Sequence, residues 1–236
     1  MNLFQAISIK NINEINRLLE EEKEDIFQLS ENNYNSLHKA VSTGFECEIK
    51  IIEILLKKAS KFSRKKFDEY INLQNNKGET PLFLSCRRAG DWSGHEEVIK
   101  ILISNGADLN IQDKEGNTPL YIALYQHENM NICELLINSG AKLDIKNNEG
   151  ETVRDIMGIP KYILELMDKV DRYNELEKQN KIKKTKLSII TGYRERTGKA
   201  RLKKNKSRKK KKSRKKKKSR KKKKKKKKKK NKSKKR

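Results

Sequence analysis

The chain has 236 residues, of which 59 are Lys or Arg and 31 are Asp or Glu, for a formal net charge of +28. Thirty of the basic residues lie in residues 199–236, which contain no acidic residue, so residues 1–198 carry 29 basic and 31 acidic side chains and are nearly neutral. No apolar run approaches a membrane span, and three widely spaced cysteines argue against a disulfide framework and a zinc site.

Residues 1–29 carry apolar side chains at helical spacing. They include Leu3, Ile7, Ile15 and Leu18. Residues that recur every three to four positions form one face of a helix. The segment therefore predicts short helices, although it lacks the turn signals that appear later in the chain.

Residues 30–74 hold one helix start and two length excesses. The run Asn35-Ser36-Leu37-His38 precedes a similar run at Thr80 by 45 residues. Compared with the repeats that follow, about three extra residues fall near 46–48 and about nine in residues 59–69. The second excess predicts a basic loop or an extension of the preceding helix.

Residues 75–146 contain the strongest internal repeat. Gly-Glu-Thr-Pro-Leu at 78–82 recurs as Gly-Asn-Thr-Pro-Leu at 116–120. A threonine caps a helix through its side-chain oxygen, and proline suits the first helical position, so a helix is expected to begin at each Thr-Pro pair. Gly106 and Gly140 follow apolar helical runs and are expected to end those helices in a left-handed conformation.

Residues 147–180 repeat the pattern once more and then change. Thr152 follows Gly150-Glu151 but has no proline after it. From residue 160, apolar side chains at helical spacing predict a helix to about residue 180. A helix there would cover the open end of the stack of repeats.

Residues 181–236 form a basic tail that is expected to be disordered, because it has almost no apolar surface to bury. Its cations predict contact with polyanions, such as RNA or DNA bound without sequence specificity, and nuclear or nucleolar targeting. The candidate residues are Lys209, Lys210, Lys211, Lys212, Arg214, Lys215, Arg220, Lys221, Lys225 and Lys230. An alternative is low-complexity sequence with no selected function.

The repeated residues resemble the ankyrin repeat family, whose unit has about 33 residues and a Thr-Pro-Leu-His signature. The resemblance is strongest over 75–150 and weaker over 1–170. It implies a mainly α solenoid of about five helix-turn-helix units with turn or hairpin tips. The expected division is a degenerate N-terminal repeat at 1–29, a repeat with insertions at 30–74, repeats at 75–112 and 113–146, a C-terminal capping repeat and helix at 147–180, and the tail at 181–236.

The resemblance also implies where a partner binds, since ankyrin partners usually contact the concave face built from turn tips and first helices. The implied positions are Asn76, Lys77, Glu79, Arg87, Arg88, Lys114, Glu115, Asn117, Tyr125, Gln126, Asn148 and Glu149. Trp92, in an insertion of about five residues, is added as an exposed anchor, and the alternative is that it packs back onto neighbouring helices. His38 keeps the signature histidine, whereas Phe83 and Tyr121 replace it, so the hydrogen bond of that histidine is expected to be absent or altered there.

Together these features predict a non-enzymatic module that binds an unidentified protein and acts as a monomer. No cofactor, metal or catalytic residue is expected, and the Gly192 to Ala200 segment has the wrong spacing for a phosphate-binding loop. The N-terminus lacks a secretory signal, so an intracellular location is expected, in the nucleus or alternatively the cytoplasm. A membrane surface is not expected as the partner. A second hypothesis makes the tail the main binding element of an RNA-, ribosome- or chromatin-associated protein.

Overall fold

The structure is a computed structural model that describes residues 1–21, 25–43, 47–88, 95–126 and 130–185, except for the side chain of Cys47. These residues are mainly helical and include no β-strand. The chain divides into two units, Met1–Arg172 and Tyr173–Arg236. The helix pairs described next all belong to the first unit.

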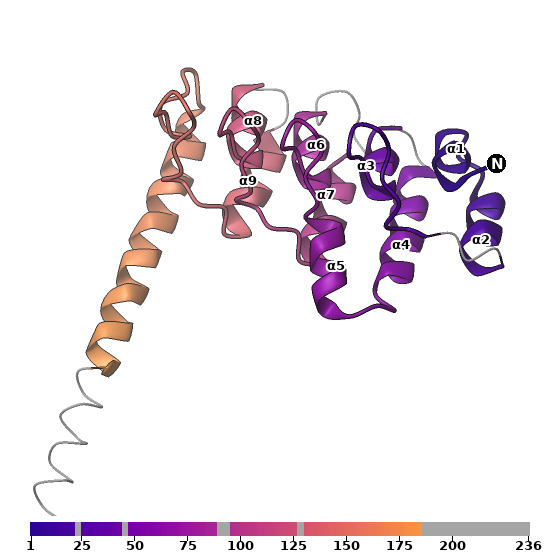
Figure 1. Cartoon of the computed structure of the whole chain (residues 1–236). Helices are drawn as coiled ribbons and strands as arrows, with labels where there is room; N and C mark the ends of the chain where they lie inside the picture. Colours follow the sequence, from indigo (N-terminus) through magenta and orange to yellow (C-terminus); the bar gives the residue numbers. More distant parts are fainter. Residues whose placement is uncertain (22–24, 44–46, 89–94, 127–129, 186–236) are drawn as a thin grey trace, which may run out of the picture. The chain divides into compact units, whose positions relative to one another are not determined.

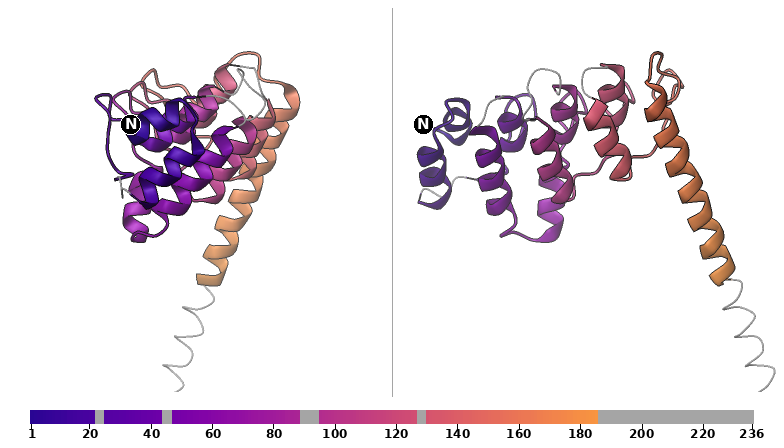
Figure 2. Two further views of the ribbon diagram at one scale, coloured as in Figure 1. Left: turned by 90° about the vertical axis from the view of Figure 1, so that its right-hand side faces the viewer. Right: turned by 180° about the vertical axis from the view of Figure 1, so that it is seen from behind.

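Helices of the first unit follow one another in antiparallel pairs. The pairs are α1 (Leu3–Ser8) with α2 (Ile12–Glu20), α3 (Ser36–Val41) with α4 (Cys47–Ala59), α6 (Pro81–Arg87) with α7 (His95–Ser104), and α8 (Pro119–Tyr125) with α9 (Met130–Asn138). The first helices α1, α3, α6 and α8 form one row, and their second helices form another row beside it (Figures 1 and 2). The predicted mainly α solenoid is confirmed.

Helix starts lie where the capping residues predict them. The hydroxyl oxygen of Thr80 accepts a hydrogen bond from the amide of Phe83 at 3.1 Å, and that of Thr118 accepts one from the amide of Tyr121 at 3.2 Å. The proline that follows each threonine is the first helical residue. Asn35 caps α3 in the same way, through the amide of His38 at 2.9 Å. These bonds satisfy amides that the helix itself leaves without a partner.

Gly106 and Gly140 follow α7 and α9 with φ angles of 92° and 95°. A left-handed residue at this position is strained for any side chain but glycine, so both residues end their helices as predicted. The chain then turns back toward the next tip.

The length excess at 59–69 forms a separate helix, which corrects the expectation of a loop or an extension of α4. Helix α5 (Arg64–Ile71) starts after Ser63, whose hydroxyl oxygen accepts a hydrogen bond from the amide of Lys66 at 3.4 Å. Phe67, Tyr70 and Ile71 are buried. A polar cap and a three-residue apolar face therefore give this segment its own helix, packed beside α4.

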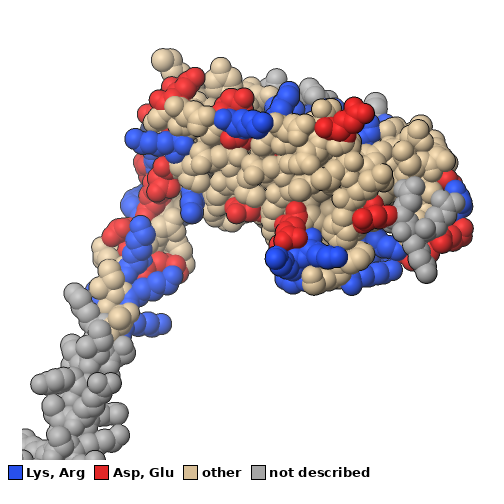
Figure 3. Space-filling model, in the orientation of Figure 1, with Lys and Arg blue, Asp and Glu red and all other residues tan. Residues whose placement is uncertain are grey.

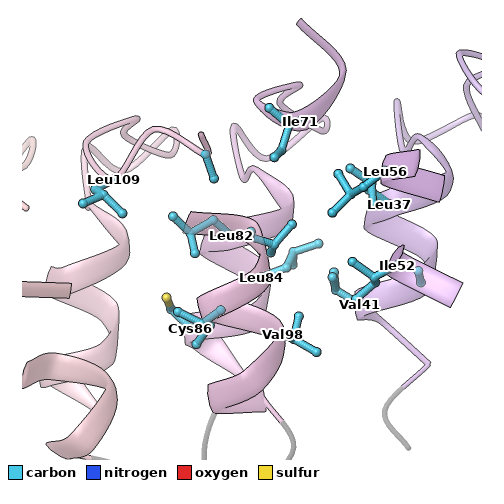
Figure 4. Packing of buried hydrophobic residues seen from close by; sticks show 14 of the residues in the cluster. Leu37, Val41, Ile52, Leu56, Ile71, Leu82, Leu84, Cys86, Val98 and Leu109 are labelled. Atoms are coloured by element: carbon cyan, nitrogen blue, oxygen red, sulfur yellow. The ribbon is translucent and has the colours of Figure 1, made fainter. Parts of the chain in front are cut away.

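The core runs between neighbouring repeats rather than through a single centre. Figure 4 shows Leu84 of α6 extending toward Val41 and Ile52 of the preceding pair, with Cys86 on the other side of the helix. All four side chains are buried. Each internal helix pair thus buries apolar surface against both neighbours, which makes a stack of repeats stable where one repeat alone would not be.

The last repeat departs from its predecessors. Residues 152–160 do not form a first helix. Instead, the amide and the hydroxyl of Thr152 each donate a hydrogen bond to Asp155 Oδ2 at 2.7 Å, which closes a turn. Residues 161–172 are then helical and bury Ile163 and Met167. In the second unit residues 173–185 are helical and exposed, five residues beyond the predicted end.

Candidate partner-binding surface

Three turn tips at residues 75–79, 113–117 and 147–151 share one hydrogen-bond pattern. In each, the side-chain oxygen of the first residue accepts from two backbone amides, two and four positions later. The distances are 2.8 and 3.0 Å at Asn75, 3.1 and 2.7 Å at Asp113, and 3.0 and 2.9 Å at Asn147. Short polar side chains form such turns readily, so the exposed tip residues sit on a fixed backbone.

Backbone hydrogen bonds join each tip to the next. The amide of Asn76 donates to the carbonyl of Asn32, that of Lys114 to Lys77, and that of Asn148 to Glu115, each at 3.0 Å. The tips therefore form a continuous series joined by equivalent backbone hydrogen bonds.

Two glutamines that the sequence analysis missed reinforce this series. The side-chain amide of Gln74 donates to the carbonyl of Gly78 at 2.7 Å and to that of Gln112 at 2.9 Å. The amide of Gln112 donates to the carbonyls of Gly116 at 2.5 Å and Lys146 at 2.9 Å. The signal was present in the sequence, because the two glutamines are separated by the same 38 residues as the two Thr-Pro pairs.

Most of the predicted tip residues present their side chains to solvent. Asn76, Lys77, Lys114, Glu115, Asn148 and Glu149 are exposed, and Asn117 is half-buried. Their side chains are of mixed charge, and Figure 3 shows acidic and basic residues alternating along the upper part of this face. The tips thus offer a mixed polar surface rather than a field of one sign.

Glu79 differs from the other tip residues, because only 3% of its surface is exposed. Its carboxylate accepts a hydrogen bond from the side-chain amide of Asn75 at 2.8 Å and pairs with the guanidinium of Arg87 at 2.5 Å. The burial of Glu79 corrects the expectation that its side chain contacts a partner. Its carboxylate fixes the position of Arg87, a first-helix candidate that is itself half-buried.

The first helices contribute one strongly exposed aromatic residue. Tyr125 at the end of α8 is 62% exposed, and its ring stacks on that of Tyr121 with centroids 6.2 Å apart and planes 12° apart. Arg88 and Gln126 are half-buried. An exposed aromatic ring that rests on a second ring can contact a partner with little loss of side-chain freedom.

Tyr121 occupies the position of the signature histidine and makes a different hydrogen bond. His38 donates from Nε2 to the carbonyl of Glu79 at 3.0 Å, whereas the Tyr121 hydroxyl donates to Oε2 of Glu151 at 2.6 Å. This carboxylate raises the pKa of Tyr121 to about 12, because it stabilises the protonated phenol. The expectation of an altered hydrogen bond is confirmed at Tyr121, and at Phe83 the side chain is simply buried.

Several predicted residues lie outside the described part of the chain. These are Trp92 and all the candidate polyanion-binding residues of the tail. Cys86 and Cys133 are described and buried. Burial raises the pKa of the Cys86 thiol, and it raises that of Cys133 to about 12, so neither has the character of a reactive thiolate.

Within the ranges that the structure describes, no cluster of three or more His, Cys, Asp or Glu side chains is arranged to bind a metal ion. None of the helices in those ranges combines the length and apolar character needed to cross a bilayer.

Residues 65–147 match a family model for ankyrin repeats in three copies. An ankyrin repeat protein of Acanthamoeba polyphaga mimivirus is 45% identical over 58 residues, which cover 25% of this chain and 13% of that protein. NF-kappa-B inhibitor alpha of Gallus gallus is 39% identical over 57 residues, or 24% of this chain and 16% of its own length. An ankyrin repeat-containing protein of Schizosaccharomyces pombe is 37% identical over 51 residues, 22% of each chain.

These alignments span less than a quarter of the length of each relative, so they identify the repeat unit and leave the rest of each relative unmatched. The matched segment holds helices α6 to α9 and the first two of the three tips. Sequence comparison and structure therefore agree that residues 65–147 are similar to ankyrin repeats.

Proposed function

We propose that the chain binds a protein partner through the surface formed by its tips and the exposed ends of the first helices α6 and α8. The observation that supports this most directly is the hydrogen-bonded series of tips, which presents exposed polar side chains from successive repeats. The exposed Tyr125, stacked on Tyr121, adds an aromatic contact from α8. Rigid presentation of this kind reduces the entropy lost when a partner binds.

The comparisons support a protein as the partner without naming one. One relative is, by its name, an inhibitor of NF-kappa-B, and its similarity to this chain is confined to the repeats. Ankyrin repeats serve many different partners, since the contact residues vary on a constant scaffold. The identity of the partner therefore has to come from experiment.

The lysine-rich tail enters the proposal as a second, separate element. Residues 199–236 carry 30 cations and no anion, which supports salt-dependent binding to nucleic acid and nuclear targeting. In this proposal the tail determines location and the repeats select the partner. The alternative, in which the tail is the main binding element, rests on the same charge count.

The experiment is capture of cell proteins by the full chain and by a chain lacking residues 199–236, each washed well above physiological salt. High salt removes contacts between exposed charges and leaves a packed interface largely intact. We expect a discrete protein to be retained by both forms. It should be lost when Tyr125→Ser and Glu149→Ala are combined, which removes two exposed contacts from the proposed surface.

A matched control changes two exposed side chains on a second helix, Glu97→Ala with Lys100→Ala on α7. This variant should retain the partner as well as the unchanged chain does. Equal retention by both variants would reject the tip surface. Retention that needs the tail and disappears at high salt would favour the alternative, in which the tail carries the binding.

A further inference from the structure

Helix α5 and the segment before it make a basic surface with no counterpart in the other repeats. Residues 57–66 include six Lys or Arg and no Asp or Glu. Basic side chains gather around α5 at the lower edge of the molecule in Figure 3, away from the upper part where the charges alternate. The insertion therefore adds a positive region to a body whose overall charge is close to neutral.

Two adjoining hollows lie between this insertion and the second helices α4 and α7. One hollow, of about 420 Å³, is lined by Phe62, Arg64, Phe67, Ile103 and Gly106. The other hollow, of about 370 Å³, is lined by Glu53, Leu56, Lys57 and Ile101. Ser60, Ser104 and Asn105 line both, so the two hollows form one groove, hereafter the α5 groove.

An aromatic residue stands at the edge of the α5 groove in a fixed orientation. Phe62 is 41% exposed, although its ring makes an edge-to-face contact with that of Phe27 at 4.9 Å. The ammonium of Lys66 lies 5.8 Å from the Phe62 ring centroid and 5.7 Å from that of Phe27. Phe67 and Ile103 add further apolar wall, so the groove has a preformed place for one large apolar side chain.

Exposed cations lie in the same chain segment as this apolar place, and Arg64 itself lines it. The side chains of Lys61, Arg64 and Lys65 are 57%, 73% and 87% exposed. Each pairs with a carboxylate, Lys61 with Glu20 at 3.2 Å, Arg64 with Asp68 at 2.8 Å and Lys65 with Glu69 at 3.7 Å. Exposed pairs of this kind contribute little free energy, so a partner's carboxylates can join or replace these anions.

We propose that the α5 groove is a second docking surface, and that it binds an acidic protein segment carrying one large apolar side chain. The apolar side chain would enter between Phe62, Phe67 and Ile103, and the flanking carboxylates would contact Lys61, Arg64 and Lys65. Charge complementarity assigns the acidic character, and the hollow beside Phe62 suits the insertion of one apolar side chain. A nucleic acid whose bases stack on Phe62 is the alternative that the RNA arm of the test distinguishes. The site uses second helices and is independent of the proposed tip surface.

The test is a titration of the full chain, labelled at isoleucine methyl groups, with a short synthetic peptide of Asp and Glu around one central Phe. Ile101 and Ile103 line the α5 groove, whereas Ile122 on α8 serves as a reference on a first helix. We expect the resonances of Ile101 and Ile103 to shift and that of Ile122 to stay in place. A peptide with Ser in place of Phe should bind the groove about tenfold more weakly.

Two charge-reversal variants separate the groove from the other cations of the chain. Lys61→Glu with Lys65→Glu should weaken the affinity for the peptide about tenfold, as followed by the shift of the Ile103 resonance. Lys77→Glu with Lys114→Glu makes the same change of net charge at the exposed tips, and this variant should leave the affinity for the peptide unchanged. An unaltered isoleucine methyl spectrum before titration shows that each variant is folded.

Three results would overturn the proposal. Binding of the acidic peptide that is detected by fluorescence anisotropy but does not shift the resonances of Ile101 and Ile103 would assign its binding to the tail. Equal weakening by both variants would indicate general attraction between charges. An RNA oligonucleotide or an anionic lipid vesicle that shifts the same methyl groups at least as strongly as the peptide would show a surface for polyanions rather than an acidic protein segment.

Discussion

His38, Phe83 and Tyr121 occupy equivalent positions in three repeats and make different contacts there. His38 links two backbones, Phe83 fills the space with carbon, and Tyr121 reaches the side chain of Glu151. The position needs a planar ring of moderate size, while the hydrogen bond depends on what the next tip offers. Residue type and tip residue are therefore expected to act in pairs.

Tyr121→Phe tests that pairing. The change removes the hydroxyl that donates to Glu151 and keeps the ring, so we expect the free energy of unfolding to fall by about 1 kcal/mol. Urea unfolding followed by circular dichroism measures it. In the matched cycle, Glu151→Ala should cost clearly less in the Tyr121→Phe background than in the unchanged chain. Equal costs in the two backgrounds would mean that the bond contributes nothing.

His38 predicts a pH dependence of stability. Burial lowers the pKa of His38 from the usual 6.5 to about 4, and the hydrogen bond to the Glu79 carbonyl only partly opposes this shift. Between these pH values the unfolded chain binds a proton that the folded chain does not. The stability that His38 contributes is therefore complete above about pH 6.5 and decreases as the pH falls toward 4, by about 1.4 kcal/mol per pH unit at most.

His38→Phe provides the comparison for this pH dependence, because Phe83 shows that a phenylalanine fits the equivalent position. We expect the stability difference between the unchanged chain and the variant to shrink from pH 7 to pH 5, as measured by urea unfolding at each pH. A difference that stays constant over this range would show that His38 titrates alike in the folded and unfolded chains.

At the scale of elements, the tips depend on close approach between successive repeats. Gly78 and Gly116 have φ angles of 80° and 81°, and a β-carbon at either would come within 2.8 or 2.7 Å of a backbone nitrogen in the next tip. Gly150 has a φ of 84° and open space around the same position. The same backbone conformation thus occurs with and without a neighbour.

Alanine at each glycine separates the two effects. Gly150→Ala should cost about 1 kcal/mol, from the left-handed backbone alone. Gly78→Ala and Gly116→Ala should each cost about 2 kcal/mol or more, since the next tip must also move. Thermal and urea unfolding of the three variants measures the order, and equal costs would rule out the close contact between tips.

The sequence predicted those elements whose cause lies within a few residues. Thr80-Pro81 and Thr118-Pro119 set helix starts because capping is local, and Gly106 and Gly140 set helix ends for the same reason. The sequence did not predict α5 as a separate helix, because its capping residue, Ser63, has no equivalent in the other repeats with which it could be compared. The burial of Glu79 was also missed, since it depends on Arg87, eight residues away and on the next helix.

At the scale of the whole molecule, the ends of a stack are expected to open before its middle. A terminal repeat has one neighbour where an internal repeat has two, and here the last repeat lacks a first helix. Cys86 lies in α6 and Cys133 in α9, nearer that end, and both are buried. The rates at which these two thiols react with a reagent therefore report local opening at two places along the stack.

Labelling these thiols under native conditions tests the prediction. In a Cys47→Ser background, Cys133 should react with a thiol reagent several-fold faster than Cys86, because each buried thiol must first become exposed by local opening. Mass spectrometry of digested protein separates the two rates. Identical rates that match the global unfolding rate would instead describe a stack that opens as a single cooperative unit.

The link between tips combines a backbone hydrogen bond, as at Lys114 with Lys77 and Asn148 with Glu115, with side-chain bonds from residues such as Gln74 and Gln112. A copied repeat carries the glutamine and the glycine of this link along with its backbone bond. Gene duplication can therefore insert a new copy between two old ones and find both junctions already compatible. Copy number becomes a heritable variable that lengthens the binding surface in whole steps, while insertions such as α5 diversify the opposite side without interrupting the series.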